Sequence, residues 1–216
     1  MTVQGISAVS LGADGAAGFR LHPGYLDPRA AENLVREVLS LVESAPFYRP
    51  TMPRTGTPLR NLMTNLGSLG WVSDRSGYRY EPLHPETHRP WPPLPQDVLA
   101  IWRELSGYPH LPEACLVNLY RGADAKLGLH IDADEEAVSA PVVSISLGDG
   151  ALFRLGGPER KSSTRSMRLG SGDVVVLGGA SRRFYHGVDR IYPGSSRLIP
   201  GGGRINLTLR RVTHPS

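Results

Sequence analysis

The stretch Leu127-Gly128-Leu129-His130-Ile131-Asp132-Ala133-Asp134 combines apolar residues with a histidine and two aspartates. Its alternating pattern is typical of a β-strand, and we expect a strand over residues 126–131. Side chains two residues apart on a strand point to the same face. The strand would therefore present His130 and Asp132 side by side, and Asp134 shares their face if the strand continues.

His130 and Asp132 are two of the three protein ligands in a facial triad, in which two histidines and a carboxylate leave three positions of an Fe(II) ion open. The third ligand has to come from a distant strand, and His186 within residues 183–188 is the best candidate. The alternatives are ordinary ones. A single strand histidine is usually a packed residue, and residues 132–136 could form a solvated acidic turn.

Strand patterns continue through the second half of the chain, where short segments of period two are separated by Gly-rich turns. The candidate strands cover residues 115–120, 126–131, 141–148, 151–155, 164–169, 173–177, 183–190 and 203–212. Many short, regularly spaced strands indicate a sandwich or barrel. We therefore predict a mainly β fold with flanking helices (α+β), built around a jelly roll over residues 114–212.

Two helices are expected before these strands. Asp27-Pro28 is a good helix start, because Asp caps N-termini and Pro is tolerated at the first helical position. Apolar residues then recur at helical spacing until Pro46. The second helix should cover residues 96–106, and both should pack on one sheet. Residues 1–20 are small, polar and Gly/Ala-rich, and we expect a poorly ordered start leading into a short strand near Phe19–Leu21.

Residues 46–95 show neither the two-residue period of a strand nor the 3.6-residue period of a helix. They hold ten of the nineteen prolines, together with several tyrosines and tryptophans. A loop-rich segment of this length is usually functional or disordered, and the aromatic residues argue against disorder. We interpret it as a cover over a site, made of short strands and turns. The alternative is a structural excursion packed on the surface. No linker divides the chain, so residues 1–216 are expected to form one domain.

Composition excludes several classes of protein. With 40% hydrophobic and 20% charged residues, the chain is typical of a soluble globular domain. Cys115 is the only cysteine, which excludes a disulfide framework and a Cys-based zinc site within one chain. No apolar run approaches the roughly 20 residues that span a bilayer, and residues 1–18 lack a signal-peptide pattern. The expected protein is cytoplasmic, not membrane-bound, and monomeric, since no oligomer signal is present.

The formal net charge of +4 suits a polyanionic partner such as nucleic acid. Nearly all of the positive charge is arginine, the only lysines being Lys126 and Lys161. Arginine is suited to bidentate recognition of phosphate and carboxylate groups. Many basic proteins bind no nucleic acid, however, and codon bias in a GC-rich genome produces the same arginine excess.

Three of the expected strands carry polar residues on one face. These are Asn118 and Tyr120, Ser144 and Ser146, and Arg204, Asn206, Thr208 and Arg210. The polar face could point to solvent, as in many antiparallel sheets, or line a cavity inside the roll. In a cavity the two arginines need anionic partners, because an unpaired buried charge is very costly. A small dicarboxylate is such a partner. The pattern alone leaves both interpretations open.

Taken together, these residues resemble the AlkB family of Fe(II)- and 2-oxoglutarate-dependent dioxygenases. The resemblance rests on Asn118-x-Tyr120, His130-x-Asp132, His186 and Arg204-x-Asn206-x-x-x-Arg210, and on segments such as 140–148, 172–176 and 184–187. It covers about residues 24–212 in the right order and spacing. It implies a double-stranded β-helix with a nucleotide-recognition lid over residues 46–95. It also implies Fe(II), 2-oxoglutarate and O₂ as cofactor and co-substrates.

The resemblance further implies roles for single residues. His130, Asp132 and His186 would bind Fe(II). The 2-oxoglutarate site would contain Asn118, Tyr120, Arg204, Asn206 and Arg210, with Arg204 at the carboxylate far from the metal and Arg210 at the near end. Trp71 would stack on the target base, and further substrate contacts would be Tyr78, Tyr80, Asp134, Arg160 and Lys126. Ala133 and Leu177 depart from the pattern, since a close family member carries lysine and tryptophan there.

The reaction implied by the resemblance is oxidative demethylation of alkylated bases, such as N1-methyladenine and N3-methylcytosine, in single- or double-stranded DNA, with RNA left open. The methyl group is hydroxylated and leaves as formaldehyde. A base inside a duplex is out of reach, so a single strand or a flipped base is required. One alternative is an oxygenase of this type acting on a protein side chain or a small molecule. Another is a nucleic-acid-binding module without turnover.

Overall fold

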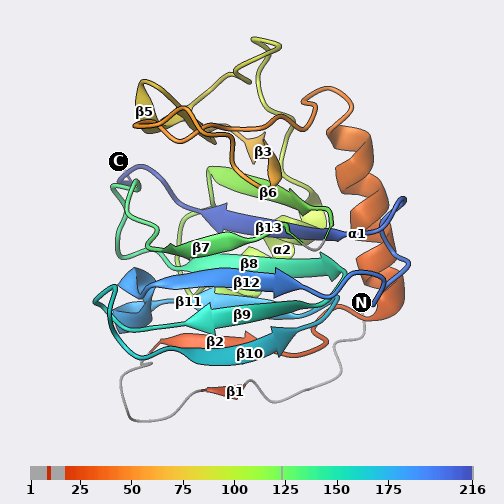
Figure 1. Cartoon of the computed structure of the whole chain (residues 1–216), viewed down its shortest axis with the longest axis vertical. Helices are drawn as coiled ribbons and strands as arrows, with labels where there is room; N and C mark the ends of the chain where they lie inside the picture. The colour runs from red at the N-terminus through yellow and green to blue at the C-terminus, as the bar shows by residue number, and fades with distance from the viewer. Residues whose placement is uncertain (1–8, 11–17, 123, 216) are drawn as a thin grey trace.

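The computed structural model describes residues 9–10, 18–122 and 124–215. Two antiparallel sheets face each other, and both long helices lie on the outer side of the larger sheet (Figure 1). The larger sheet has the order β1 (Val9–Ser10), β2 (Phe19–His22), β11 (Val174–Leu177), β8 (Val142–Gly148), β13 (Arg204–Arg210), β6 (Ala114–Tyr120) and β3 (Leu62–Gly67). The smaller sheet has the order β10 (Arg165–Leu169), β9 (Ala151–Leu155), β12 (His186–Ile191) and β7 (Leu127–His130). The predicted mainly β jelly roll is confirmed.

The two helices form where the sequence predicts them. Helix α1 covers Pro28–Leu41, and the Asp27 side chain accepts a hydrogen bond from the Ala30 amide at 2.8 Å, as expected of an N-cap. Helix α2 covers Gln96–Leu105. Their apolar faces pack on one side of the larger sheet, where the alternate residues of β6, β8 and β13 form the main core. The inner face of that sheet is thereby left to the space between the sheets.

The inner face resolves the two interpretations of the polar strands. Asn118, Arg204, Asn206 and Arg210 are all buried, and each lines the cavity between the two sheets. The polar face of β13 therefore lines a cavity rather than facing solvent. The apolar remainder of the same space is filled by residues of both sheets.

Residues 46–95 contain three strands and several turns. Strand β3 joins the edge of the larger sheet beside β6, while β4 (Gly70–Asp74) and β5 (Gly77–Glu81) form a separate hairpin. In Figure 1 this segment forms the upper part of the molecule, above β6 and β13. The predicted short strands and turns are thus present, and the hairpin is free of the main sheet.

Among the differences between the expected and the observed strand boundaries, two affect the candidate ligands. The strand expected over residues 126–131 ends at His130, so Asp132 and Asp134 lie in the following loop and do not continue its face. The strand expected from residue 183 begins at His186, because residues Gly179–Arg183 form a short 3-10 helix, η1. The predicted strand near residue 20 is present as β2. The poorly ordered start falls largely on residues 1–8 and 11–17, which lie outside the described residues.

Within the described ranges, no helix is both long and apolar enough to cross a membrane.

Candidate active site

Three candidate metal ligands meet at one end of the roll. His130 is the last residue of β7, and its Cα partner on the neighbouring strand is His186, the first residue of β12. Asp132 lies two residues beyond His130. The ligand atoms of these three residues all lie within 4.8 Å of one another. Antiparallel pairing therefore brings together two histidines that are 56 residues apart in the sequence.

Both imidazoles present the same nitrogen to this site. His130 Nδ1 lies 2.9 Å from the Gly128 carbonyl oxygen, and His186 Nδ1 lies 3.0 Å from the Phe184 carbonyl oxygen. A carbonyl oxygen only accepts, so Nδ1 carries the proton and Nε2 keeps its lone pair. Burial lowers the pKa of His186 to about 4, which keeps that ring neutral. The Nε2 atoms lie 3.8 Å and 3.7 Å from the Asp132 carboxylate oxygens.

Asp132 keeps one charged oxygen for a cation. Burial alone would raise its pKa, but the charge of Arg210 holds that pKa well below the usual range. Arg210 donates from Nη2 to Asp132 Oδ1 at 2.8 Å. Asp132 Oδ2 is buried and has no hydrogen-bond partner among the described residues. The donor set of two imidazole nitrogens and one carboxylate oxygen fits Fe(II).

The two inner arginines offer unpaired donors to an anion. Arg204 donates to Ser146 Oγ at 2.7 Å, but its Nε is buried without a partner in the described part of the chain, as is Nη1 of Arg210. Burial lowers the pKa of Arg204 to about 10. Buried donors of this kind cost free energy unless a ligand accepts from them. Both arginines line the cavity, which has a volume of about 550 Å³ and has room for a small dicarboxylate.

Neutral polar side chains complete the inner wall. Asn118 accepts a hydrogen bond through Oδ1 from Asn61 Nδ2 at 2.6 Å, which leaves its own amide group to donate into the cavity. Asn206 donates to Ser144 Oγ at 2.8 Å. Tyr120 lines the same cavity, and burial raises its pKa to about 12, so it remains a neutral hydroxyl.

The hairpin β4–β5 brings aromatic residues to the mouth of the cavity. Trp71 and Tyr78 are stacked with ring centroids 5.5 Å apart and an interplanar angle of 18°. The Trp71 indole Nε1 donates to Asp134 Oδ2 at 2.8 Å, so the hairpin is tied to the loop that follows β7. All three residues line the cavity, and Tyr78 is 46% exposed.

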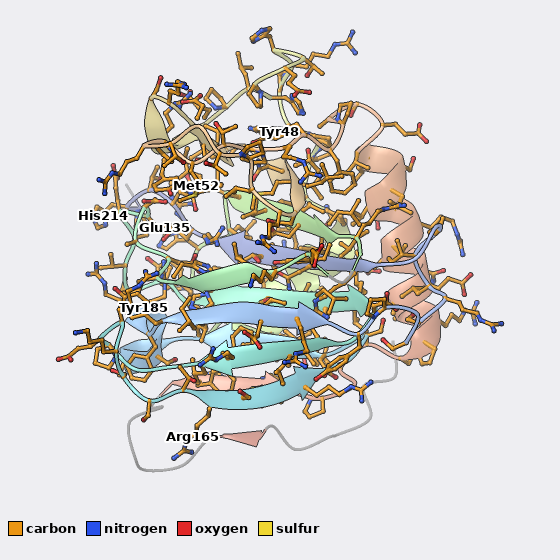
Figure 2. All side chains as sticks on the ribbon, in the orientation of Figure 1. Tyr48, Met52, Glu135, Arg165, Tyr185 and His214 are labelled. Carbon is orange, nitrogen blue, oxygen red and sulfur yellow. The ribbon has the colours of Figure 1, made fainter. Side chains whose placement is uncertain are left out.

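The remaining predicted substrate contacts lie in different surroundings. Arg160 lines the cavity and its guanidinium carbon lies 5.9 Å from the ring centroid of Tyr185. Lys126 is exposed and is not part of the cavity wall. Tyr80 points inward instead, and its hydroxyl donates to the Glu135 carboxylate at 2.5 Å. Figure 2 shows the labelled side chains of Met52, Glu135 and Tyr185 at the same end of the roll.

Several residues that support the site were not predicted from the sequence. Glu135 and Arg182 are buried beside Asp132 and form an ion pair with a 2.8 Å Nη2–Oε2 distance. Gly187 lies where an added Cβ would come within 2.6 Å of the Leu127 carbonyl oxygen. The run of three acidic residues after Asp132 was the only available signal for Glu135, and an exposed turn has the same pattern. Burial of one of the three follows only from tertiary packing.

Comparison with known proteins agrees with this arrangement. Residues 18–210 match the model of the 2OG-Fe(II) oxygenase superfamily. The chain is 52% identical to an alpha-ketoglutarate-dependent dioxygenase AlkB homolog of Caulobacter vibrioides, over 98% of this chain and 95% of that protein. It is 44% identical to the alpha-ketoglutarate-dependent dioxygenase AlkB of Escherichia coli, over 74% of each. The solved structure of OsALKBH1 superposes with a TM-score of 0.72 and 32% identity, covering 90% of this chain and 98% of that one.

The fold and the His-Asp-His site thus define a 2OG-Fe(II) oxygenase, an enzyme that uses Fe(II), 2-oxoglutarate and O₂. Within that superfamily the chain belongs to the AlkB family of dioxygenases. The predicted family, enzyme class and cofactors are confirmed. The roles of individual residues remain predictions, and they form part of the proposal below.

Proposed function

We propose that this enzyme oxidatively demethylates alkylated bases in DNA, acting on a single strand or on a base flipped out of a duplex. Its substrates would be N1-methyladenine and N3-methylcytosine, with RNA as a second nucleic acid to test. The observation that carries the proposal is the pair of stacked aromatic rings and the Asp134 carboxylate, which line the same cavity as the candidate metal ligands.

In the proposed centre, His130 and His186 would hold Fe(II) through Nε2, and Asp132 would hold it through Oδ2. Fe(II), 2-oxoglutarate and O₂ would together supply the oxidation, in which the methyl carbon gains a hydroxyl group and 2-oxoglutarate is converted to succinate and CO₂. The hydroxymethylated base then loses formaldehyde. The chain itself supplies ligand geometry, a neutral imidazole at His186 and a largely buried site.

The co-substrate would lie between the inner arginines. Arg204 is assigned to the carboxylate far from the metal, because it lies at the other end of β13 from the candidate ligands. Arg210 is assigned to the near end, since it already contacts Asp132. Asn118, Tyr120 and Asn206 would supply the remaining polar contacts from the cavity wall.

The lid residues would recognise the base. Aromatic faces stack on any base, and Trp71 and Tyr78 offer such faces at the entrance. N1-methyladenine and N3-methylcytosine are cationic, so the Asp134 carboxylate would add attraction. The indole of Trp71 already orients that carboxylate. Arg160 would contact the strand from the opposite wall, and Tyr80 would support the hairpin from beneath rather than touch a phosphate.

Names of relatives support a nucleic-acid substrate. A protein of Arabidopsis thaliana, 40% identical over 47% of this chain, is named a DNA N(6)-methyladenine demethylase. A protein of Schizosaccharomyces pombe, 35% identical over 46% of this chain, is named a tRNA demethylase. These names favour a nucleic acid over a protein side chain, and they leave the choice between DNA and RNA to experiment.

The test is mass spectrometry of a short single-stranded DNA that carries one N1-methyladenine, with a matched RNA in parallel. Each is incubated with enzyme, Fe(II), 2-oxoglutarate, ascorbate and air. We expect loss of one methylene mass from the DNA and release of formaldehyde, neither of which occurs without 2-oxoglutarate or with Asp132→Ala. An unchanged oligonucleotide, with succinate still accumulating, would show that the enzyme oxidises a different class of substrate.

A further inference from the structure

Four buried charged side chains form one cluster behind the candidate metal site. Arg210 contacts Asp132 Oδ1 at 2.8 Å through Nη2, and its Nε lies 3.3 Å from Glu135 Oε1. Glu135 Oε2 in turn lies 2.8 Å from Arg182 Nη2. The exposed fraction of every one of these side chains is 6% or less. Two cations and two anions thus balance inside the protein, where each depends on the others.

Arg182 fixes the loop that carries both carboxylates. Besides Glu135, it donates from Nη1 to the Asp132 carbonyl oxygen at 2.8 Å and from Nε to the Ala140 carbonyl oxygen at 2.9 Å. One guanidinium therefore joins η1 to both ends of residues 132–140. This accounts for the position of the Asp132 backbone, although Asp132 lies beyond the end of β7.

The cluster also reaches the lid. Tyr80 on β5 donates its hydroxyl hydrogen to Glu135 Oε1, the same oxygen that faces Arg210 Nε. The Glu135 carboxylate therefore interacts with one lid tyrosine and with two arginines. The exposed neighbour Glu136 has none of these contacts.

We infer that Glu135 is a positioning residue of the iron site. Because Glu135 compensates part of the positive charge of Arg210, Arg210 attracts Asp132 less strongly and Asp132 stays available to bind the metal. Through Tyr80, the lid contacts the same group of charges. This inference rests on the iron and co-substrate residues of the proposed function. The physical reason is that Arg210 has two carboxylate neighbours. When one loses its charge, Arg210 interacts more strongly with the other, and the site that accepts a dication becomes more positive.

This arrangement predicts opposite effects on the two ligands of the centre. Glu135→Gln keeps the shape and removes the charge, so Fe(II) affinity should fall by roughly 10- to 100-fold, as is usual for residues that support metal ligands. The affinity for 2-oxoglutarate at saturating Fe(II) should equal or exceed that of the unaltered enzyme, because a dianion gains from the more positive site. A general loss of packing would instead weaken both.

Tyr80→Phe provides a second, milder variant. It removes only the hydroxyl group that donates a hydrogen bond to Glu135. Without that bond, Glu135 should interact more strongly with Arg210. Fe(II) affinity should therefore stay the same or increase, in contrast to Glu135→Gln. Glu136→Gln makes the same chemical change on an exposed side chain of the same loop and serves as the matched control, with both affinities unchanged.

The experiment is an anaerobic titration of the unaltered enzyme and the three variants with Fe(II), in competition with a coloured chelator. A titration of the Fe(II)-loaded proteins with 2-oxoglutarate follows, read from the visible charge-transfer absorption. The inference is supported if Glu135→Gln binds Fe(II) more weakly but 2-oxoglutarate no more weakly, and if Tyr80→Phe keeps its Fe(II) affinity. Unchanged Fe(II) affinity in Glu135→Gln, parallel loss of both ligands, or weaker Fe(II) binding by Tyr80→Phe overturns it.

Two features keep this test decisive. If Glu135→Gln does not fold, Tyr80→Phe still carries the test, since any loss of Fe(II) affinity in that variant overturns the inference and retention or gain supports it. No nucleic acid is used, so the outcome is independent of whether the enzyme demethylates DNA. A failure of the oligonucleotide assay would therefore leave these affinities interpretable.

Discussion

At the scale of single residues, the site consists of charged side chains that are mostly buried. Arg204 is the clearest case, because its side chain is fully buried and its hydrogen bonds within the protein use only part of its donors. A buried guanidinium without a carboxylate partner is unfavourable. In the proposed function, a carboxylate of 2-oxoglutarate would accept hydrogen bonds from the remaining donors of Arg204 and offset this cost.

Replacing Arg204 should therefore act on the co-substrate. Arg204→Lys keeps the charge but loses the planar fork that pairs with a carboxylate. Hydrogen bonds to charged groups contribute about 1.5–3 kcal/mol, so the apparent KM for 2-oxoglutarate should rise roughly 10- to 100-fold. The change in kcat should be smaller. Succinate formation at varied 2-oxoglutarate measures both, and Arg168→Lys, on an exposed part of β10, is the control. An unchanged KM would remove Arg204 from the co-substrate site.

Gly187 shows how a residue without a side chain can control the metal site. An added Cβ would lie 2.6 Å from the Leu127 carbonyl oxygen and 2.9 Å from the Gly128 carbonyl carbon, both on β7. Gly187→Ala must therefore push β7 away from β12 and separate His130 from His186. We expect Fe(II) affinity to fall at least about tenfold, a loss typical of disturbed ligand support, as measured by chelator competition.

The matched control lies on the neighbouring strand. A Cβ added at Gly128 meets nothing within 4 Å, and the residue has no left-handed backbone conformation. Gly128→Ala should bind Fe(II) like the unaltered enzyme. Equal loss in both variants would mean that glycine flexibility, rather than the close approach of β7 and β12, is what the site requires.

At the scale of elements, the hairpin β4–β5 and the loop after β7 together form the entrance. The bond between Trp71 and Asp134 joins them, and Tyr78 covers the other face of the indole. The hairpin has no strand partner in either large sheet. Its position over the cavity therefore depends on contacts outside a strand ladder, such as those between the Asn65 side chain on β3 and the Trp71 backbone.

Substitution of Trp71 should separate substrate recognition from the chemistry beneath it. Stacking on an aromatic ring contributes about 1–3 kcal/mol per base, so Trp71→Ala should lower kcat/KM for a methylated oligonucleotide by roughly 10- to 100-fold. Trp71→Phe keeps an aromatic ring but loses the hydrogen bond to Asp134. Its kcat/KM should lie between those of the unaltered enzyme and Trp71→Ala. The KM for 2-oxoglutarate should not change in either variant. A parallel rise in that KM would instead assign Trp71 to the structure of the co-substrate site.

Elements also mark what the sequence could and could not predict. Helix α1 was predictable because a cap, a proline and an apolar stripe coincide at Asp27 and after it. That His130 and His186 would meet at one site was predicted from the strand patterns and the family resemblance, whereas their direct pairing across β7 and β12 is seen only in the structure. The end of β7 at His130 was not predictable, because Ile131 and Asp132 continue the alternation in the sequence while Arg182, fifty residues away, holds the Asp132 carbonyl. Long-range hydrogen bonds of this kind leave no local pattern.

At the scale of the whole molecule, the two sheets contribute different parts of the centre. The smaller sheet carries both histidines on β12 and β7, whereas the larger sheet carries the inner arginines on β13. Strand β7 has four residues and lies at the edge of its sheet, paired within the described structure only with β12. A metal ion at the site would therefore connect this short edge strand, the following loop and β12.

Metal binding should for this reason stabilise the fold as a whole. A ligand present at 100 times its Kd adds about 2.7 kcal/mol to the free energy of unfolding. For a chain of this size each kcal/mol corresponds to roughly 2–4 °C in Tm, so Fe(II) under anaerobic conditions should raise Tm by about 5–10 °C. Hydrogen exchange should slow most over residues 127–135, because the edge strand and its loop gain a second attachment. In Asp132→Ala, Fe(II) should neither raise Tm nor slow hydrogen exchange over these residues. A rise in Tm that persists in this variant would show that the ion acts at another place.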